Sequence, residues 1–271
     1  MRRWFMIGLI SLWCGLTFAA ERSGIPKPLS WKINGEKREA IVEFPAGPRD
    51  QPAPVVFIFH GHGNTMEKFA QRWDVHKHWP EAVAVYPQGL PTASRVDPKG
   101  KHAGWQTLAG TEGDRDLKLV DAILKTLHDK HAIDDDRIFS AGLSNGGGFS
   151  YVLWTARSDV FSAYAPCAAI LHVPKNMTLK PGPVLHIAGE NDHTAPFEEQ
   201  MESMKTVRRI NGCKAQPVDW GEVGKLYAPK TKSGAPFISI IHPGGHGAPP
   251  HTFEAIIKFF KEHPRKHSTT D

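Results

Sequence analysis

The fold of this chain is decided by one stretch, Arg137-Ile138-Phe139-Ser140-Ala141-Gly142-Leu143-Ser144-Asn145-Gly146-Gly147-Gly148. Its first half is apolar and predicts a strand, and the segment 149–155 that follows has a helical pattern. Between them lies Gly-x-Ser-x-Gly, in which Gly142 and Gly146 avoid a collision between a Cβ atom and the neighbouring backbone. Such a turn holds a serine hydroxyl above the sheet, next to the unpaired N–H groups of the helix. The stretch therefore predicts a nucleophile elbow at Ser144, although a glycine-rich turn with a structural serine has the same pattern.

Strand and helix patterns alternate along the rest of the chain. The wholly apolar run 55–59 is typical of a strand that is covered on both faces. Further strands are expected at 37–44, 82–86, 160–169, 184–188 and 237–241, and further helices at 65–79, 114–131, 197–210 and 252–262. This alternation predicts an α/β fold, with a mostly parallel central sheet and helices on both faces. Such sheets place their functional sites at the carboxyl ends of the strands.

Candidate catalytic residues follow three of these strand ends. Ser144 follows one, Asp192 comes shortly after the strand at 184–188, and His246 lies in a glycine-rich loop after the last strand. The chain order Ser, Asp, His is that of the α/β-hydrolase fold. We therefore expect Ser144 to be the nucleophile, His246 to take its proton, and Asp192 to orient and stabilise the imidazole. Alternatives for the acid and the base remain: Glu190 for the first, and His193, His242 and His251 for the second.

An oxyanion on the substrate would need two backbone N–H donors near Ser144. The first is expected from Asn145, the residue after the nucleophile. The second is expected from the loop 60–64 after the first apolar strand, with His62 as the first choice and Gly63 as the alternative.

The residues of these loops allow two other classes of function. A metal hydrolase would use His60 and His62, completed by Asp192 and His246, but Asn64 stands where such loops commonly have an acidic ligand. We therefore expect no metal and no cofactor. A catalytically inactive binding protein of the same fold would be expected to lack one member of the triad.

The first twenty residues have the pattern of a signal peptide. Arg2 and Arg3 precede the apolar run 4–18, and Ala19 and Ala20 offer cleavage points. An apolar run of about fifteen residues is short for a membrane span, so we expect no lasting membrane anchor. Residues 21–271 then form one secreted or periplasmic domain.

The composition is that of an ordinary globular domain, with 40% hydrophobic and 23% charged residues among 271. A formal charge of +5 is too small to indicate a nucleic-acid partner. Removal of the leader leaves Cys167 and Cys213, for which a disulfide is expected in an oxidising compartment, with two buried free thiols as the alternative. The oligomeric state is left open.

Several stretches carry a resemblance to a known group of enzymes. They are 55–64, 83–89, Trp105, 114–121, 133–148 and the loops at Gly189 and Gly244. Together they resemble the secreted esterases of the polyhydroxybutyrate depolymerase and feruloyl esterase group. The resemblance places the nucleophile on Ser144, the acid on Asp192, the base on His246 and the oxyanion loop on 60–64.

The resemblance implies an ester substrate, which can be polymeric, and leaves feruloyl, acetyl and hydroxybutyrate as possible acyl groups. Trp105 is able to stack on a sugar or an aromatic acyl group, or else is a buried structural residue. Gln106 and Gly148 stand where these enzymes often have larger residues, so both are expected to touch the acyl pocket. The connection 169–183 is short and polar, which predicts an open site without a large lid.

Overall fold

The computed structural model of the chain describes residues 24–46, 51–173 and 178–265. The predicted signal peptide and its cleavage points lie outside the described residues. Within the described ranges, no helix combines the length and the apolar character that a membrane crossing requires.

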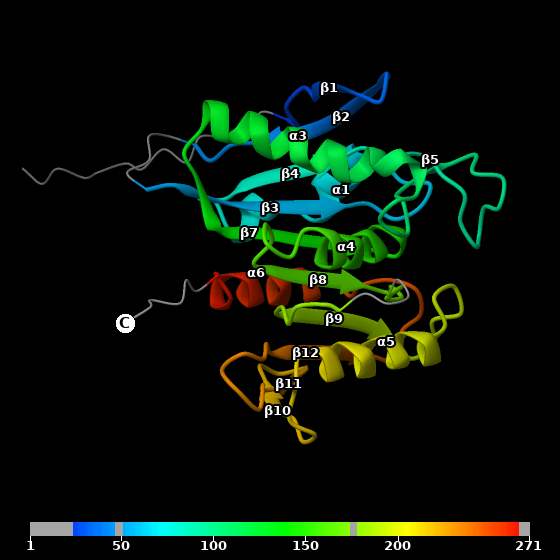
Figure 1. Cartoon of the computed structure of the whole chain (residues 1–271), viewed down its shortest axis with the longest axis vertical. Coiled ribbons are helices and arrows are strands. Elements are labelled where there is room, and N and C mark those ends of the chain that lie inside the picture. Colours follow the sequence, from blue (N-terminus) through cyan, green and yellow to red (C-terminus); the bar gives the residue numbers. More distant parts are fainter. Residues whose placement is uncertain (1–23, 47–50, 174–177, 266–271) are drawn as a thin grey trace, which may run out of the picture.

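A ten-stranded sheet crosses the molecule in the order β1-β2-β4-β3-β7-β8-β9-β12-β11-β10 (Figure 1). The strands from β4 to β12 in that order are parallel, and antiparallel strands extend the sheet at both edges. The sheet strands are β1 (Leu29–Ile33), β2 (Glu36–Glu43), β3 (Ala53–Phe59), β4 (Val83–Pro87), β7 (Ile133–Leu143), β8 (Ala163–Cys167), β9 (Val184–Gly189), β10 (Val218–Trp220), β11 (Gly224–Tyr227) and β12 (Phe237–His242). The predicted mostly parallel sheet is confirmed.

Helices cover both faces of this sheet and explain why most residues of its central strands are apolar. On one face lie α3 (Arg115–Lys130), α4 (Asn145–Ala156) and α5 (Phe197–Ile210), and on the other lie α1 (Met66–Arg72), α2 (Val75–His78) and α6 (Thr252–Glu262). Every residue of β3, β4, β8 and β9 is buried between these two layers. Burial on both faces removes the alternation of apolar and polar residues that a half-exposed strand shows.

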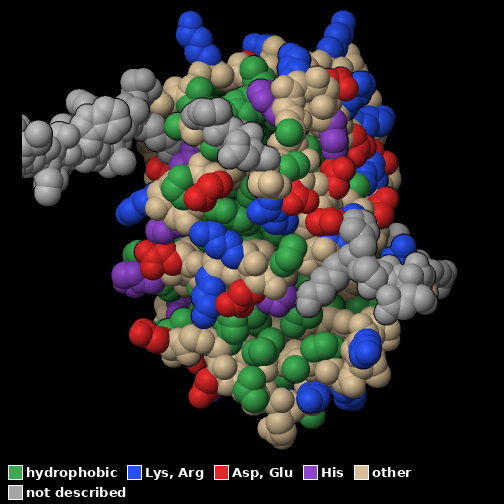
Figure 2. Space-filling model, turned by 90° about the vertical axis from the view of Figure 1, so that its left-hand side faces the viewer, with side chains coloured by type: hydrophobic (Ala, Val, Ile, Leu, Met, Phe, Trp, Pro, Cys, Tyr) green, Lys and Arg blue, Asp and Glu red, His purple; other side chains and the backbone are tan. Residues whose placement is uncertain are grey.

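The carboxyl ends of the parallel strands lie at one side of the molecule, on the right in Figure 1. A long connection between β4 and α3 projects at this side, and it contains a small separate sheet of β5 (Leu90–Pro91) and β6 (Ala103–Gly104) and the short helix η1 (Glu112–Asp114). The opposite side is shown in Figure 2, where Lys and Arg side chains are interspersed with Asp and Glu. The connection from β8 to β9 has no helix among its described residues.

Two features of the secondary structure differ from the prediction. The helix expected at 65–79 is divided into α1 and α2, because the Asp74 side chain accepts a hydrogen bond from the backbone N–H of Lys77 and starts a new helix there. The edge strands β1, β10 and β11 were not predicted. They are three to five residues long and partly exposed, so they lack the apolar runs that identify the central strands.

Candidate active site

Ser144 occupies a strained turn between β7 and α4. Its backbone has φ 56° and ψ −121°, a conformation that residues other than glycine rarely adopt. The Ser144 N–H donates to the carbonyl of Cys167 at 2.8 Å, and its own carbonyl accepts from the N–H of Gly148 at 2.8 Å. A Cβ on Gly142 would collide with the Gly146 backbone, and a Cβ on Gly146 would collide with the Phe59 carbonyl. Close contact between β7, β3 and α4 therefore requires both glycines.

Asp192 and His246 meet because β9 and β12 are parallel neighbours, so the loops after them run side by side. The two loops are tied together by the Asn191 N–H, which donates to the Gly244 carbonyl at 3.0 Å. His246 Nδ1 lies 3.0 Å from Asp192 Oδ1 and 2.9 Å from Oδ2. A carboxylate only accepts, so Nδ1 carries the hydrogen and Nε2 is left free to take a proton. The structure thus pairs His246 with Asp192.

The Asp192 carboxylate is buried and has several donors besides His246. Its side chain is fully inaccessible, whereas that of His246 is 25% exposed. Oδ1 accepts from the N–H groups of Thr194 and Ala195, each at 2.9 Å. Oδ2 accepts from the side-chain amide of Gln200 at 3.0 Å. These donors compensate the desolvation of the buried charge and fix the plane of the carboxylate.

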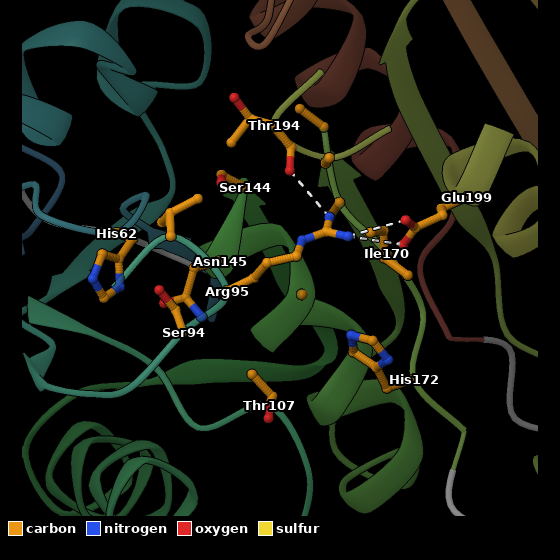
Figure 3. A pocket seen from close by; sticks show the side chains of 15 residues that line it. His62, Ser94, Arg95, Thr107, Ser144, Asn145, Ile170, His172, Thr194 and Glu199 are labelled. Atoms are coloured by element: carbon orange, nitrogen blue, oxygen red, sulfur yellow. Dashed lines mark hydrogen bonds and ion pairs between the residues drawn. The ribbon is translucent and has the colours of Figure 1, made fainter. Parts of the chain in front are cut away.

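A pocket opens beside Ser144 at the carboxyl side of the sheet (Figure 3). Its cavity has a volume of about 240 Å³ and is open to solvent. Its wall includes Asn145 and Gly148 from α4 and the small residues Ala168 and Ala169 that follow β8. The pocket is therefore built around the elbow.

The expected oxyanion donors also border this pocket. Asn145 begins α4, where N–H groups have no acceptor within the helix. Its side chain accepts from the Trp105 N–H at 2.6 Å and donates to the Trp105 carbonyl at 3.1 Å, so the backbone N–H keeps a fixed direction. His62 lines the pocket from the loop after β3. The alternative donor, Gly63, is engaged elsewhere, because its N–H donates to the Ala103 carbonyl at 2.7 Å.

Comparison with known proteins identifies the group to which this chain belongs. No protein-family model matches the chain. It is 30% identical over 225 residues to feruloyl esterase C of Emericella nidulans, and the match covers 80% of this chain and 79% of that protein. The chain belongs to the feruloyl esterase family. Feruloyl esterase D of Neurospora crassa is 26% identical over 300 residues, with 94% of this chain and 96% of that protein covered.

The resemblance to feruloyl esterases that the sequence indicated is thereby confirmed, and the family to which the chain belongs is one of esterases. Among solved structures, the acetyl xylan esterase from Aspergillus awamori superposes with a TM-score of 0.64 at 11% identity, covering 87% of this chain and 99% of that one. At that identity the likeness shows the fold alone. The fold of this feruloyl esterase family member is the α/β-hydrolase fold, as predicted.

The structure places Trp105 and Gln106, which were expected to contact the substrate, away from the pocket. Trp105 is 0% exposed, and its indole N–H donates to the His60 carbonyl at 2.8 Å. Gln106 is 1% exposed, and its amide donates to Asp114 Oδ1 at 2.9 Å while its oxygen accepts from the Asp116 N–H at 3.1 Å. Neither side chain lines the pocket. Trp105 instead ties the connection between β4 and α3 to the residue after β3, and Gln106 ties it to the start of α3.

The four residues of the alternative metal site do not come together. His60 is buried, its Nδ1 donates to the Gly61 carbonyl at 2.9 Å, and its Nε2 accepts from the Gly89 N–H at 2.9 Å. Burial lowers the pKa of His60 to about 4, so the ring is neutral at physiological pH. His62 Nε2 instead lies 3.2 Å from Asp97 Oδ2. Among the described residues, no three or more His, Cys, Asp or Glu side chains are grouped as metal ligands.

The expected disulfide between Cys167 and Cys213 is also wrong. Both cysteines are free and buried. Cys167 ends β8 and packs into the core beneath α1 and α6, whereas Cys213 follows α5 and packs into the core on the other face of the sheet. The sheet therefore separates the two thiols, and burial raises the pKa of each.

Sequence reasoning missed two residues that shape this site, Arg95 and Gln200. The Arg95 guanidinium crosses one side of the pocket, where it donates to Glu199 Oε1 at 3.0 Å and to the Thr194 carbonyl at 3.0 Å (Figure 3). Arg95 lies in the long connection between β4 and α3, where no motif singles it out. Gln200 lies in the first turn of α5, and no local pattern there indicates a contact with Asp192.

Proposed function

We propose that this chain is a feruloyl esterase that works through a Ser144–His246–Asp192 triad and an acyl-enzyme. The observation that carries the proposal is the His246–Asp192 pair, which the loops after β9 and β12 hold at 2.9 Å on the side of the sheet where the strained Ser144 turn lines a pocket. A base that is oriented by a buried carboxylate is the arrangement that activates a serine hydroxyl.

The proposed reaction begins when Ser144 Oγ attacks the ester carbonyl and His246 Nε2 takes its proton. The backbone N–H groups of Asn145 and His62 hold the oxyanion of the tetrahedral intermediate. Collapse of this intermediate breaks the bond to the alcohol, which receives the proton from His246 and leaves Ser144 acylated. Water then attacks the acyl-enzyme with the same base, releases the acid and regenerates Ser144.

The pocket favours an aromatic acyl group such as feruloyl over acetyl or hydroxybutyrate. Its walls include Val96, Ala168, Ala169 and Ile170, which offer apolar surface to a ring. Thr107 and His172 add polar atoms that are suited to the hydroxyl and methoxy substituents of such a ring. The pocket is open to solvent, which leaves room for an alcohol that is part of a polysaccharide or another polymer.

Export to the periplasm or the cell exterior is part of the same proposal. It is supported by the leader pattern, in which Arg2 and Arg3 precede an apolar run and two alanines. Amino-terminal sequencing of the protein recovered outside the cytoplasm tests it, and a chain that still begins at Met1 would contradict it.

The serine assignment is tested with Ser144→Ala. The variant should lose hydrolysis of p-nitrophenyl acetate and methyl ferulate, and a fluorophosphonate probe should label the unaltered protein at Ser144 alone. Ser233→Ala, which removes an exposed hydroxyl in the loop that leads into the amino end of β12, serves as the control with full activity. Full activity of Ser144→Ala would overturn the triad, and a folded protein without activity or labelling would favour an inactive binding protein.

A further inference from the structure

A line of buried polar side chains continues behind Asp192 into the core. Gln200 on α5 donates its amide to Asp192 Oδ2 at 3.0 Å. The Gln200 oxygen lies 3.2 Å from His186 Nε2 on β9, and His186 Nδ1 lies 2.7 Å from the hydroxyl of Tyr151 on α4. Gln200 and His186 are 0% exposed and Tyr151 is 1% exposed. Three elements of the fold thus contribute polar groups to one connected line that ends at the acid of the triad.

The hydrogen atoms along this line can be placed from Asp192 inward. The Gln200 amide nitrogen faces two acceptors, Asp192 Oδ2 and the Ala195 carbonyl at 2.6 Å, so a flipped amide would set three oxygens against one another. The Gln200 oxygen must therefore face His186, and His186 Nε2 must carry the hydrogen. His186 Nδ1 then accepts from the Tyr151 hydroxyl. The hydrogen bonds therefore allow only one orientation of the Gln200 amide and only one tautomer of His186.

The burial of these groups keeps the arrangement fixed. The pKa of His186 is lowered to about 4 because its surroundings desolvate the charged ring, so His186 is neutral when the enzyme works. Desolvation raises the pKa of Tyr151, so its hydroxyl stays a donor. The neighbouring Cys167 thiol is likewise neutral, because burial raises its pKa. No member of the line carries a charge that would compete with that of Asp192.

We propose that Gln200 and His186 are positioning residues of the active site, which hold the Asp192 carboxylate in the plane that His246 Nδ1 requires. Tyr151 completes the line by fixing the tautomer of His186. The inference rests on the proposed triad and adds residues that touch neither the substrate nor the reacting atoms. Loss of the Gln200 donor frees Asp192 Oδ2 to rotate, and His246 is then less well oriented and its protonated form less well stabilised.

The experiment uses Gln200→Met, which keeps the length of the side chain and removes its polar atoms. For p-nitrophenyl acetate we expect kcat to fall on the order of tenfold, with KM within about twofold of the wild-type value, because outer partners orient the groups that react. The acid limb of kcat/KM should move to lower pH, because a poorly held Asp192 stabilises protonated His246 less. The low-field proton resonance of the His246 Nδ1–H should weaken or shift in parallel.

Asn211→Leu is the matched control, because Asn211 is also a buried amide at the other end of α5, bonded only to the backbone of Gly182 and Pro236. It should lower thermal stability and leave the acid limb and the low-field resonance in place. A Gln200→Met enzyme with wild-type kcat, acid limb and resonance overturns the inference. The inference is also overturned if the acid limb of Asn211→Leu moves as far as that of Gln200→Met.

Tyr151→Phe decides the question if Gln200→Met does not fold, since it removes a single oxygen. A kcat reduction of about two- to threefold and a weaker shift of the acid limb in the same direction are expected, because one neutral hydrogen bond is lost at a distance from the acid. An unchanged acid limb and resonance contradict the inference. Activity that survives Ser144→Ala would instead overturn the triad, so the two failures are distinguishable.

Discussion

The guanidinium of Arg95 lies 3.0 Å from the carboxylate of Glu199 and joins the long loop after β4 to the start of α5 across the pocket. The two side chains are 53% and 47% exposed, so their ion pair contributes little to stability in water. Its position beside Ser144 gives it another consequence, because it forms one wall of the space that an acyl group would enter (Figure 3).

Replacement of Arg95 should alter substrate binding more than it alters the stability of the fold. For Arg95→Met we expect a KM for methyl ferulate several-fold higher, an almost unchanged KM for p-nitrophenyl acetate, and a midpoint of thermal unfolding within about 2 °C of wild type. Steady-state kinetics with both esters and a thermal melt check this. Lys225→Met, which breaks the exposed Lys225–Asp219 pair near the sheet edge, is the control. Equal changes of KM for the two esters would contradict the role in the acyl pocket.

Gly148 offers a second test of the pocket. It faces the pocket from the first turn of α4, and no heavy atom lies within 4 Å of the position of an added Cβ. Gly148→Ala should therefore raise the free energy of unfolding by about 0.5–1 kcal/mol, because a helical glycine loses more backbone entropy on folding than alanine. Gly148→Phe should reduce kcat/KM for methyl ferulate at least tenfold and spare p-nitrophenyl acetate, because its ring occupies the acyl space.

Urea unfolding and kinetics with the two esters measure these effects. Gly146→Ala is the contrasting variant, because its Cβ would meet the Phe59 carbonyl and should prevent folding. Retention of feruloyl activity in a folded Gly148→Phe enzyme would show that the acyl group binds elsewhere.

The reactivity of the two cysteines tests whether Cys167 and Cys213 are buried on opposite faces of the sheet. Because Cys167 and Cys213 are buried on opposite faces of the sheet, neither should react with dithionitrobenzoate in the folded enzyme. Both should react in denaturant, and a reducing agent should leave the thermal midpoint unchanged. A mass of the processed protein lower by two hydrogens under non-reducing conditions would contradict the free thiols.

The parts of the fold that the sequence predicted well are those where local pattern and burial agree. The strands β3, β9 and β12 are apolar runs that end in glycine- or histidine-rich loops, and a parallel sheet brings the ends of such strands to one side. The pairing of Asp192 with His246 followed from that rule together with chain order. The short edge strands and the division between α1 and α2 depend on individual hydrogen bonds that leave no periodic signal.

The misassigned and missed residues share one cause, which is that their surroundings depend on how the elements pack and leave no local pattern in the sequence. Trp105 and Gln106 lie in a polar loop that looks exposed, but bonds to His60 and Asp116 draw them into the core. Cys167 and Cys213 were paired by count alone, and only the position of the sheet shows that they are separated. Gln200 and His186 lie in a helix and a strand whose patterns are ordinary. Their roles arise only when α5 packs against β9.

The two neutral histidines, His60 and His186, predict a particular dependence of stability on pH. Burial lowers the pKa of each to about 4 in the folded chain, below the ordinary value of 6.5. The unfolded chain therefore binds these protons first as the pH falls, and the stability that each neutral ring contributes is present above about pH 6.5 and is lost as the pH falls towards 4. The loss at the acid end is on the order of 3 kcal/mol for each histidine.

His60→Gln isolates the contribution of one ring, because glutamine keeps a donor and an acceptor and does not titrate. Urea unfolding of the variant and the wild type between pH 7.5 and 4.5 should show a free energy of unfolding that falls less steeply in the variant as the solution is acidified. Subtracting the two free energies of unfolding cancels the contribution of the carboxylates that both proteins share. The slope of this difference against pH therefore reports the titration of His60 alone. Parallel curves over this range would mean that His60 titrates in the folded protein as it does in the unfolded chain, and its hydrogen bonds to Gly61 and Gly89 would then not hold it neutral.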